Sequence, residues 1–188
     1  SYHSDLDIVY LYDGGSSGLS TDVLSHFFSR LSQRLQHVLN TTTRAGILYE
    51  TDIRLRPSGR SGAMVSSIKA FEDYQTEHAW TFEHQALVRA RLISQSSEFT
   101  DLFESARQQI LCGEREIQSL AAEIDDMRKK MAAANDRSND TQFDLKLGSG
   151  GMVDIEFISQ YLVLRHGNDI PELLRDRSTV ELLKQCAA

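Results

Sequence analysis

The chain has 188 residues, a net charge of −7 and two cysteines, Cys112 and Cys186. An acidic chain argues against nonspecific binding of nucleic acid, which needs a basic surface, and two distant cysteines form neither a disulfide framework nor a metal knuckle. The sequence has no run of about 18 apolar residues, the minimum for a membrane span. It therefore predicts a cytoplasmic protein of one domain or two small ones, without a nucleic-acid or membrane partner.

The first stretch of the chain alternates between polar and apolar residues, which is typical of a β-strand. Asp5 and Asp7 share one face of this strand. The apolar residues occupy the other face: Leu6, Ile8, Tyr10 and Tyr12. Neighbouring carboxylates repel each other, and a hard divalent cation such as Mg²⁺, which also binds substrate phosphates, relieves that repulsion. The pattern indicates phosphoryl or nucleotidyl transfer, although two acids on a solvated strand end that bind nothing give the same short pattern.

A Gly/Ser loop follows at residues 14–18, and a helix is expected over residues 22–39, where apolar residues recur at helical spacing. This helix connects the first strand to a second acidic strand. We expect it to bury four residues against the sheet: Leu24, Phe28, Leu31 and Leu35.

The second strand is expected over residues 46–55 and ends at Pro57. If it pairs beside the first strand, Asp52 completes a site of three carboxylates. Arg54 and Arg56 lie on the same face as Asp52 and can donate to phosphate oxygens. An acid and base ladder on an exposed strand, serving only solubility, is the alternative.

The stretch 58–62 is rich in Ser and Gly, so it is either a phosphate-binding loop that includes Arg60 or a surface hairpin. The rest of the chain reads as helices separated by a polar loop at 135–141. Their expected ranges are 66–77, 80–93, 99–110, 117–131, 152–166, 171–174 and 178–185. The glycines at 148–151 precede the helix at 152, and amides at a helix N-terminus suit an anion.

Several of these stretches together carry a resemblance to a known family. They are Ser4 to Asp7, Tyr49 to Gly62, Ala79 to Arg91, Phe143 to Lys146 and Gly150 to Phe157. The sequence resembles the bifunctional glutamine synthetase adenylyltransferase/adenylyl-removing enzyme, which has two nucleotidyltransferase domains of the DNA polymerase β superfamily. The run from Trp80 to Arg91 and the acid at Asp154 favour its C-terminal, adenylylating half.

The resemblance implies an α+β fold. It predicts a nucleotidyltransferase part at 1–95, with a mixed sheet and helices, followed by an all-helical domain at 96–188. One departure concerns the Gly-Gly or Gly-Ser turn that precedes the Asp-x-Asp strand in the superfamily. Only three residues precede Ser4 here. We therefore expect a fragment that lacks its first strand and this turn, is truncated at both ends, and has doubtful activity on its own.

The resemblance also implies roles for the candidate residues. Asp5 and Asp7 would hold the metal that bridges the triphosphate of ATP, and Asp52 would bind a second metal or accept the proton of the attacking hydroxyl. The expected nucleotide-binding residues are Ser4, Arg54, Arg56, Arg60 and Lys146. Two acids belong to an element that faces the nucleotide site, Asp154 and Glu156, although Asp154 can equally complement the dipole of its helix.

The implied activity is AMP transfer from ATP to a tyrosine of glutamine synthetase, with Mg²⁺ as cofactor, in the regulation of nitrogen metabolism. The implied partners are glutamine synthetase and the PII signal protein. Phosphorolytic removal of AMP is one alternative, and a non-catalytic fragment that docks either partner is another. The sequence assigns no role to three charged residues, Glu83, Arg89 and Arg91.

Overall fold

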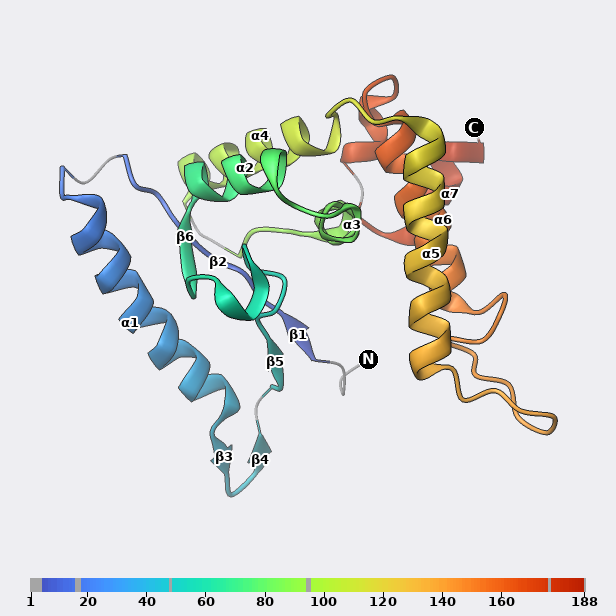
Figure 1. Ribbon diagram of the computed structural model, residues 1–188. Helices are drawn as coiled ribbons and strands as arrows, with labels where there is room; N and C mark the ends of the chain where they lie inside the picture. Colours follow the sequence, from blue (N-terminus) through green and yellow to red (C-terminus); the bar gives the residue numbers. More distant parts are fainter. Residues whose placement is uncertain (1–4, 16–17, 48, 94–95, 176, 188) are drawn as a thin grey trace. The chain divides into compact units, whose positions relative to one another are not determined.

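The computed structural model describes residues 5–15, 18–47, 49–93, 96–175 and 177–187. The chain divides into two compact units, the N-terminal unit Ser1–His78 and the helical unit Ala79–Ala188. All strands of the described residues belong to the N-terminal unit (Figure 1). The fold is α+β, as predicted. Within the described ranges, none of the helices has the length and apolar character needed to span a membrane.

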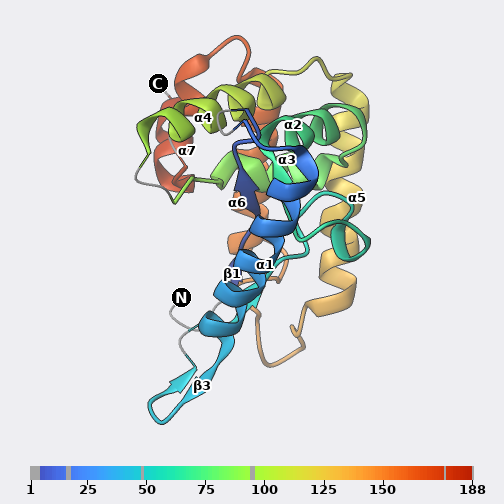
Figure 2. The same cartoon turned by 90° about the vertical axis from the view of Figure 1, so that its left-hand side faces the viewer.

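The strands of the N-terminal unit are short and lie in three pairs. Two pairs are parallel, β1 with β5 and β2 with β6, and the third, β3 with β4, is an antiparallel hairpin. The bounds are β1 Leu6–Asp7, β2 Tyr10–Tyr12, β3 Thr42–Thr43, β4 Gly46–Ile47, β5 Thr51–Asp52 and β6 Val65–Ser67. Figures 1 and 2 both show the hairpin projecting past the C-terminal end of helix α1, Thr21–Asn40.

Both predicted strands are wrong in extent. The first is divided at Ile8 and Val9, because its two halves pair with different partners, β1 with β5 and β2 with β6. Of the second, predicted over residues 46–55, only β5 lies beside the first strand. Its start belongs to the hairpin instead, and the chain turns after Asp52.

Helix α1 begins and ends within a residue of its predicted bounds and supplies part of a small core. Leu24 is buried beside Tyr12 and Val65, and Phe28 stacks on the Tyr12 ring with 4.9 Å between the ring centroids. The expected burial of Leu31 and Leu35 is wrong, since both are exposed. The strand pairs are too short to reach them, so apolar side chains along α1 stay uncovered within this unit.

The C-terminal end of α1 holds strand β5 in place. Gln36 Nε2 and Asn40 Nδ2 each donate a hydrogen bond of 2.9 Å to the hydroxyl oxygen of Thr51, the first residue of β5. Beyond β5 lie the short 3₁₀ helix η1, Gly59–Ser61, strand β6 and helix α2, Ile68–Glu77. The Ser67 hydroxyl accepts from Ala70 N at 3.1 Å and caps α2, as its sequence position predicts.

The described part of the helical unit contains no strand. Its helices are α3 Thr81–Arg89, α4 Ser97–Leu111, α5 Ile117–Asn135, α6 Met152–His166, η2 Pro171–Leu174 and α7 Thr179–Ala187. Helix α3 packs against α4, α5 and α6, and α6 also contacts α5, α7 and η2. Apolar residues at helical spacing fill this core, among them Val88, Leu111 and Val163, which are completely buried.

The compact units meet between His78 and Ala79, whereas the predicted domains are 1–95 and 96–188. Helix α3 accounts for the difference, because it lies N-terminal to the predicted boundary but packs on the helices that follow. The predicted domain limits, 1–95 and 96–188, describe the domains of the family and stay a prediction.

Arg107 lies at the centre of the helical unit and is 1% exposed. Its guanidinium donates to three backbone carbonyls, Leu87 O at 2.8 Å, Val88 O at 2.6 Å and Leu174 O at 2.9 Å. The carbonyls of the last turn of a helix lack partners inside that helix. Arg107 therefore satisfies the end of α3 and ties it to η2. Burial lowers the pKa of Arg107 to about 10, so it stays charged at neutral pH.

We predict that Arg107→Met destabilises the protein by about 3–5 kcal/mol, because it leaves buried carbonyls without a donor and removes a charge matched to them. The midpoint of urea unfolding, followed by circular dichroism, measures the loss. Arg165→Met, on the exposed face of α6, is the control and should cost under about 1 kcal/mol. Equal effects of the two substitutions would contradict the role of Arg107.

Candidate active site

The parallel pair β1–β5 brings the predicted aspartates together. Asp7 and Asp52 are register partners, and the pair is held by Leu6 N donating to Glu50 O and Ile8 N donating to Asp52 O, both at 2.8 Å. Register partners of a parallel pair point to the same face of the sheet. Asp7 and Asp52 therefore stand side by side, as the sequence predicted for strands that pair.

Asp5 and Ser4 precede β1. Asp5 is exposed, and it lies close enough to Asp7 for its charge to influence the pKa of that residue. The predicted nucleotide contact at Ser4 falls outside the described residues. Asp5 therefore lies near the pair formed by Asp7 and Asp52.

The charges of Asp5, Asp52 and Arg54 influence the pKa of Asp7. The pKa of Asp7 is raised, first by burial and then by the negative charges of Asp52 and Asp5, while Arg54 partly offsets the rise. Oxygen donors that repel each other are the set that a hard divalent cation fits, because the cation removes the repulsion. Among the described residues, no three His, Cys, Asp or Glu side chains form a group that could hold a metal ion.

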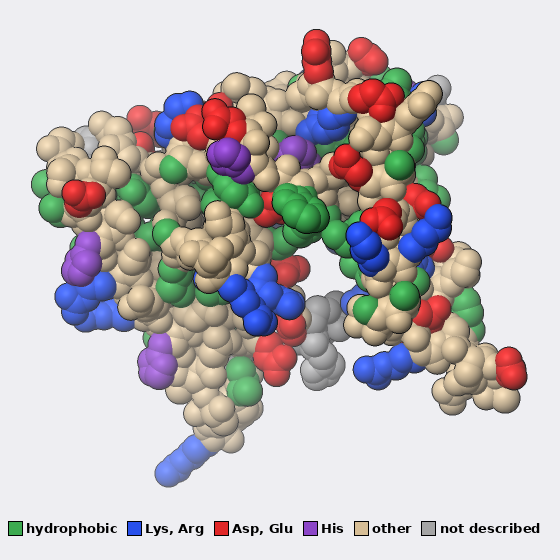
Figure 3. Space-filling view, in the orientation of Figure 1, with side chains coloured by type: hydrophobic (Ala, Val, Ile, Leu, Met, Phe, Trp, Pro, Cys, Tyr) green, Lys and Arg blue, Asp and Glu red, His purple; other side chains and the backbone are tan. Residues whose placement is uncertain are grey.

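Arg54 engages the carboxylate of Asp52. Its backbone N donates to Asp52 Oδ1 at 2.8 Å, and its Nε donates to Oδ2 at 2.6 Å, with a second guanidinium nitrogen bonded to the same oxygen. These hydrogen bonds lower the pKa of Asp52. Figure 3 shows acidic and basic side chains gathered over β1 and β5.

Arg56 and Arg60, the other two predicted phosphate ligands near β5, differ in their contacts and exposure. The guanidinium of Arg56 donates to the backbone carbonyls of Ile53, Arg60 and Gly62 at 3.2 to 3.4 Å, so it braces the turn that follows β5. The side chain of Arg60 is exposed, and its charge contributes to the lowered pKa of Asp52. Of the predicted phosphate ligands near the aspartates, Arg54 and Arg60 are therefore the accessible ones.

The turn at residues 57–62 is tightly built. Ser58 and Gly59 have φ values of 59° and 54°, in the left-handed region. A Cβ on Gly62 would lie 1.8 Å from the carbonyl oxygen of Pro57, which is far inside van der Waals contact. The sequence left this stretch open between a phosphate loop and a hairpin, and the structure shows a compact 3₁₀ turn fastened by Arg56.

The remaining predicted site residues lie in the helical unit, in or just before α6. The side chain of Lys146 is exposed. Asp154 Oδ2 accepts from Gly150 N at 2.5 Å and Oδ1 from Arg128, and Glu156 accepts from Arg89 at 2.7 Å. Asp154 therefore stabilises the start of α6, while Glu156 joins α6 to α3. These contacts lie within the helical unit.

The three charged residues without an assigned role also belong to the helical unit. Glu83 accepts from Trp80 N at 3.0 Å and stabilises the start of α3. Arg89 forms the ion pair with Glu156, and Arg91 is exposed. Glu83 and Arg89 thus have structural partners inside this unit.

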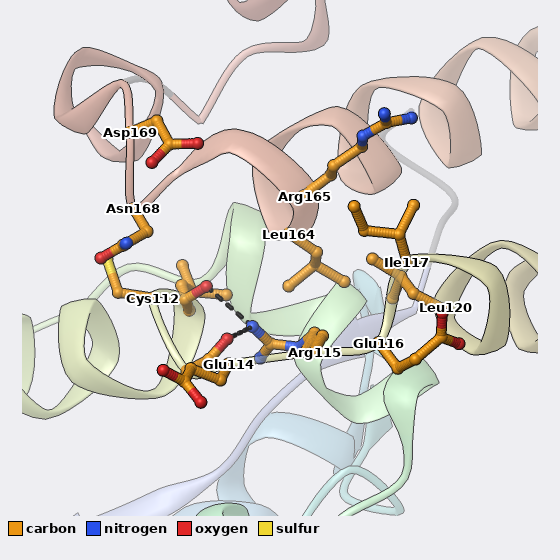
Figure 4. Close-up of a pocket in the computed structure, with 12 residues that line it drawn as sticks. Cys112, Glu114, Arg115, Glu116, Ile117, Leu120, Leu164, Arg165, Asn168 and Asp169 are labelled. Carbon is orange, nitrogen blue, oxygen red and sulfur yellow. Dashed lines mark hydrogen bonds between the residues drawn. The ribbon is translucent and has the colours of Figure 1, made fainter.

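A cavity of about 460 Å³ lies in the helical unit, between the turn that joins α4 to α5 and the C-terminal end of α6 (Figure 4). Arg115 lies at its floor and donates to the backbone carbonyls of Ile110, Leu111 and Gly113 at 2.7 to 3.0 Å. Glu116 accepts from Gln118 N and Ser119 N and caps α5. Both charged groups therefore serve the junction of the helices.

Comparison with known protein families agrees with the geometry of the N-terminal unit. The family model of glutamate-ammonia ligase adenylyltransferase (GlnE) matches residues 1–106, more than half of the chain. The chain belongs to this adenylyltransferase family. The matched segment contains Asp5, Asp7 and Asp52, and it confirms the resemblance stated from the sequence. A second model, GlnD PII-uridylyltransferase, matches residues 118–187, so α5 to α7 are similar to part of that family.

Both matches point to a nucleotidyltransferase. Membership of the adenylyltransferase family does not assign individual site residues. The roles predicted for the aspartates, the arginines, Ser4, Lys146 and Glu156 therefore stay predictions. The strand register of the N-terminal unit supports only the pairing of Asp7 with Asp52.

We predict that Gly62→Ala destabilises the turn that follows β5, because the added methyl group meets the Pro57 carbonyl. The expected cost is about 1–3 kcal/mol in the free energy of unfolding. Thermal unfolding followed by circular dichroism measures it. Gly14→Ala is the control, since a Cβ there meets its nearest neighbour at an ordinary 3.6 Å; a loss at Gly14 as large as that at Gly62 would disprove the steric reason.

Asp154 also gives a pH prediction. Its pKa is lowered, first by the hydrogen bond from Gly150 N and also by Arg128. A lowered carboxyl pKa contributes stability above the unfolded-state pKa of about 3.9, and that stability is lost as the pH falls through the folded-state pKa.

We therefore expect Asp154→Asn to lower the urea midpoint at pH 7 and to reduce its decline below about pH 4. Asp140→Asn, at an exposed loop position, should change neither value. A variant at Asp154 whose acid decline equals that of the unsubstituted chain would contradict the argument.

Proposed function

We propose that the N-terminal unit carries a Mg²⁺-dependent site that transfers AMP from ATP to a tyrosine hydroxyl of glutamine synthetase. One observation carries the proposal: Asp7 and Asp52 are register partners within the segment that matches the adenylyltransferase family. ATP and glutamine synthetase as substrates imply that the reaction takes place in the cytoplasm.

The carboxylates supply the metal ligands. Asp5 and Asp7 would hold one Mg²⁺, and Asp52 would bind a second one or accept a proton. When bound, Mg²⁺ would neutralise charge on the triphosphate oxygens and on the leaving pyrophosphate. The exposed guanidinium groups of Arg54 and Arg60 would orient the phosphates through charge-assisted hydrogen bonds.

In the proposed reaction the tyrosine oxygen bonds to the α-phosphorus of ATP, the bond from the α-phosphorus to the bridging oxygen breaks, and pyrophosphate leaves. The hydroxyl proton passes to Asp52 or to water. Asp52 accepts it more readily once Arg54 has moved away, because the hydrogen bonds from Arg54 lower the pKa of that carboxyl.

We predict that Asp7→Asn and Asp52→Asn each reduce AMP transfer by about 100-fold or more, because loss of a ligand removes several kcal/mol of charge stabilisation. Transfer of radiolabelled AMP from ATP to glutamine synthetase measures the rate, and circular dichroism checks the fold. Asp22→Asn, an exposed acid in the first turn of α1, is the control. Activity retained in either site variant would overturn the assignment of the carboxylates.

Phosphorolytic removal of AMP from glutamine synthetase is the second reaction open to the same residues. An oxygen of inorganic phosphate would bond to the α-phosphorus of the adenylylated tyrosine, the tyrosine oxygen would leave, and ADP would form, so the same carboxylates and arginines would face similar phosphate charges. Two assays separate the directions. In one, unmodified glutamine synthetase is offered with ATP. In the other, adenylylated glutamine synthetase is offered with inorganic phosphate.

A docking function is the remaining candidate, and it rests on the helical unit. Residues 118–187 match a family of PII-uridylyltransferases, which favours the PII signal protein as a partner of this unit. Glutamine synthetase is the other candidate partner, because the chain belongs to the adenylyltransferase family. A chain with Asp5, Asp7 and Asp52 replaced by Asn that still binds either protein would support docking. Loss of Mg²⁺-dependent binding of an ATP analogue in the same variant would support the catalytic site.

A further inference from the structure

The carboxylate of Asp52 is held by two separate anchors. Oδ1 accepts from the backbone N of Arg54, whereas Oδ2 accepts from the guanidinium of the same residue. If the guanidinium departs, the backbone hydrogen bond still fixes Oδ1 and leaves Oδ2 free. The carboxylate can therefore release the arginine without losing its orientation.

The two partners differ in exposure. The side chain of Arg54 is 64% exposed and that of Asp52 only 15%. Arg54 can therefore swing into solvent at little packing cost, while Asp52 stays in place. Arg56 differs from Arg54 in this respect. Its guanidinium donates to backbone carbonyls of the neighbouring turn, so its movement would break hydrogen bonds that hold that turn.

The charges near Arg54 favour an exchange with a cation. Arg54 interacts electrostatically with all three aspartates, Asp5, Asp7 and Asp52. Three carboxylates and one guanidinium leave two negative charges uncompensated, which a divalent cation would neutralise. Oδ2 of Asp52 already accepts two hydrogen bonds from the guanidinium, so a cation that binds this oxygen would displace at least one of them.

We propose, on the basis of the proposed function, that Arg54 is a positioning residue with two alternative partners. In one arrangement, which the structure shows, its guanidinium binds Oδ2 of Asp52. When a divalent cation binds, Arg54 is displaced from Oδ2 and turns to the phosphates of the nucleotide. The pair Arg54 and Asp52 thus links metal binding to nucleotide binding.

The first test measures the affinity for Mn²⁺ by electron paramagnetic resonance on the 188-residue chain, without nucleotide. Arg54→Gln removes the competitor, so it should bind Mn²⁺ about three- to tenfold more tightly than the unsubstituted chain. Arg60→Gln is the matched control, since it removes the same charge nearby without freeing Asp52. Its expected gain is below about twofold.

The second test measures binding of a non-hydrolysable ATP analogue at saturating Mn²⁺ by isothermal titration calorimetry. Arg54→Gln should weaken this binding about threefold or more, because the freed arginine is one of the phosphate ligands. Tighter metal binding combined with weaker nucleotide binding is a signature that a purely structural ion pair does not give.

The outcomes separate the inference from the function it rests on. If Asp7→Asn abolishes Mn²⁺ binding but Arg54→Gln leaves it unchanged or weaker, the exchange is wrong and the metal site stands. If neither the unsubstituted chain nor Arg54→Gln shows Mn²⁺ binding that depends on Asp7, the proposed metal site falls and the exchange with it.

Discussion

The register of the parallel pair β1–β5 depends on the side chain of Thr51. Its hydroxyl oxygen accepts hydrogen bonds from Gln36 and Asn40 at the end of α1, so the helix fixes the height at which β5 lies. Because side chains alternate along a strand, a shift of one residue would place Thr51 opposite Asp7 and turn Asp52 to the other face. Asp7 precedes α1 in the sequence and Asp52 follows it. Their proximity is thus a consequence of the packing of α1 on β5.

Electrostatic interactions then act within this group of side chains. Partial burial and two neighbouring acids raise the pKa of Asp7, and Arg54 partly offsets that rise. Natural sequences keep such a local conflict mainly at functional sites, where a ligand resolves it. Arg56, two residues further on, satisfies backbone carbonyls instead, so neighbouring arginines of one short segment serve different needs.

The sequence predicted the helices well and the strands poorly, for a physical reason. Apolar residues at helical spacing marked α1, α4 and α5, and helices form from contacts that are local in sequence. Strand extent depends on a distant partner, so an alternating pattern did not reveal that residues 5–12 change partners at Ile8 and Val9. The exposed Leu31 and Leu35 belong to the same error, because their burial presumed a longer sheet.

The pairing of Asp7 with Asp52 followed from the sequence, whereas the contacts of the arginines did not. Asp7 and Asp52 share a face by simple alternation, and that face survives even in strands of two residues. Composition gave no way to tell the free guanidinium of Arg60 from the fastened one of Arg56, because the difference arises from a turn whose geometry needs Gly62. The sequence did not indicate that Arg107 is buried, because charged residues are rarely buried. Its partners are backbone carbonyls of residues distant in sequence, which no sequence pattern reveals.

Arg107 shows how the helical unit obtains a rigid core despite a short central helix. Helix α3 has nine residues, and isolated helices of that length are marginal in water. Glu83 accepts from the backbone N of Trp80 at its start, and Arg107 satisfies the carbonyls of Leu87 and Val88 at its end. Arg177 continues the arrangement by donating to Ala90 O at 2.7 Å and to both oxygens of Glu104. Arg107 from α4 and Arg177, which precedes α7, thus satisfy carbonyls at the end of α3, which is why α3 packs with the helical unit.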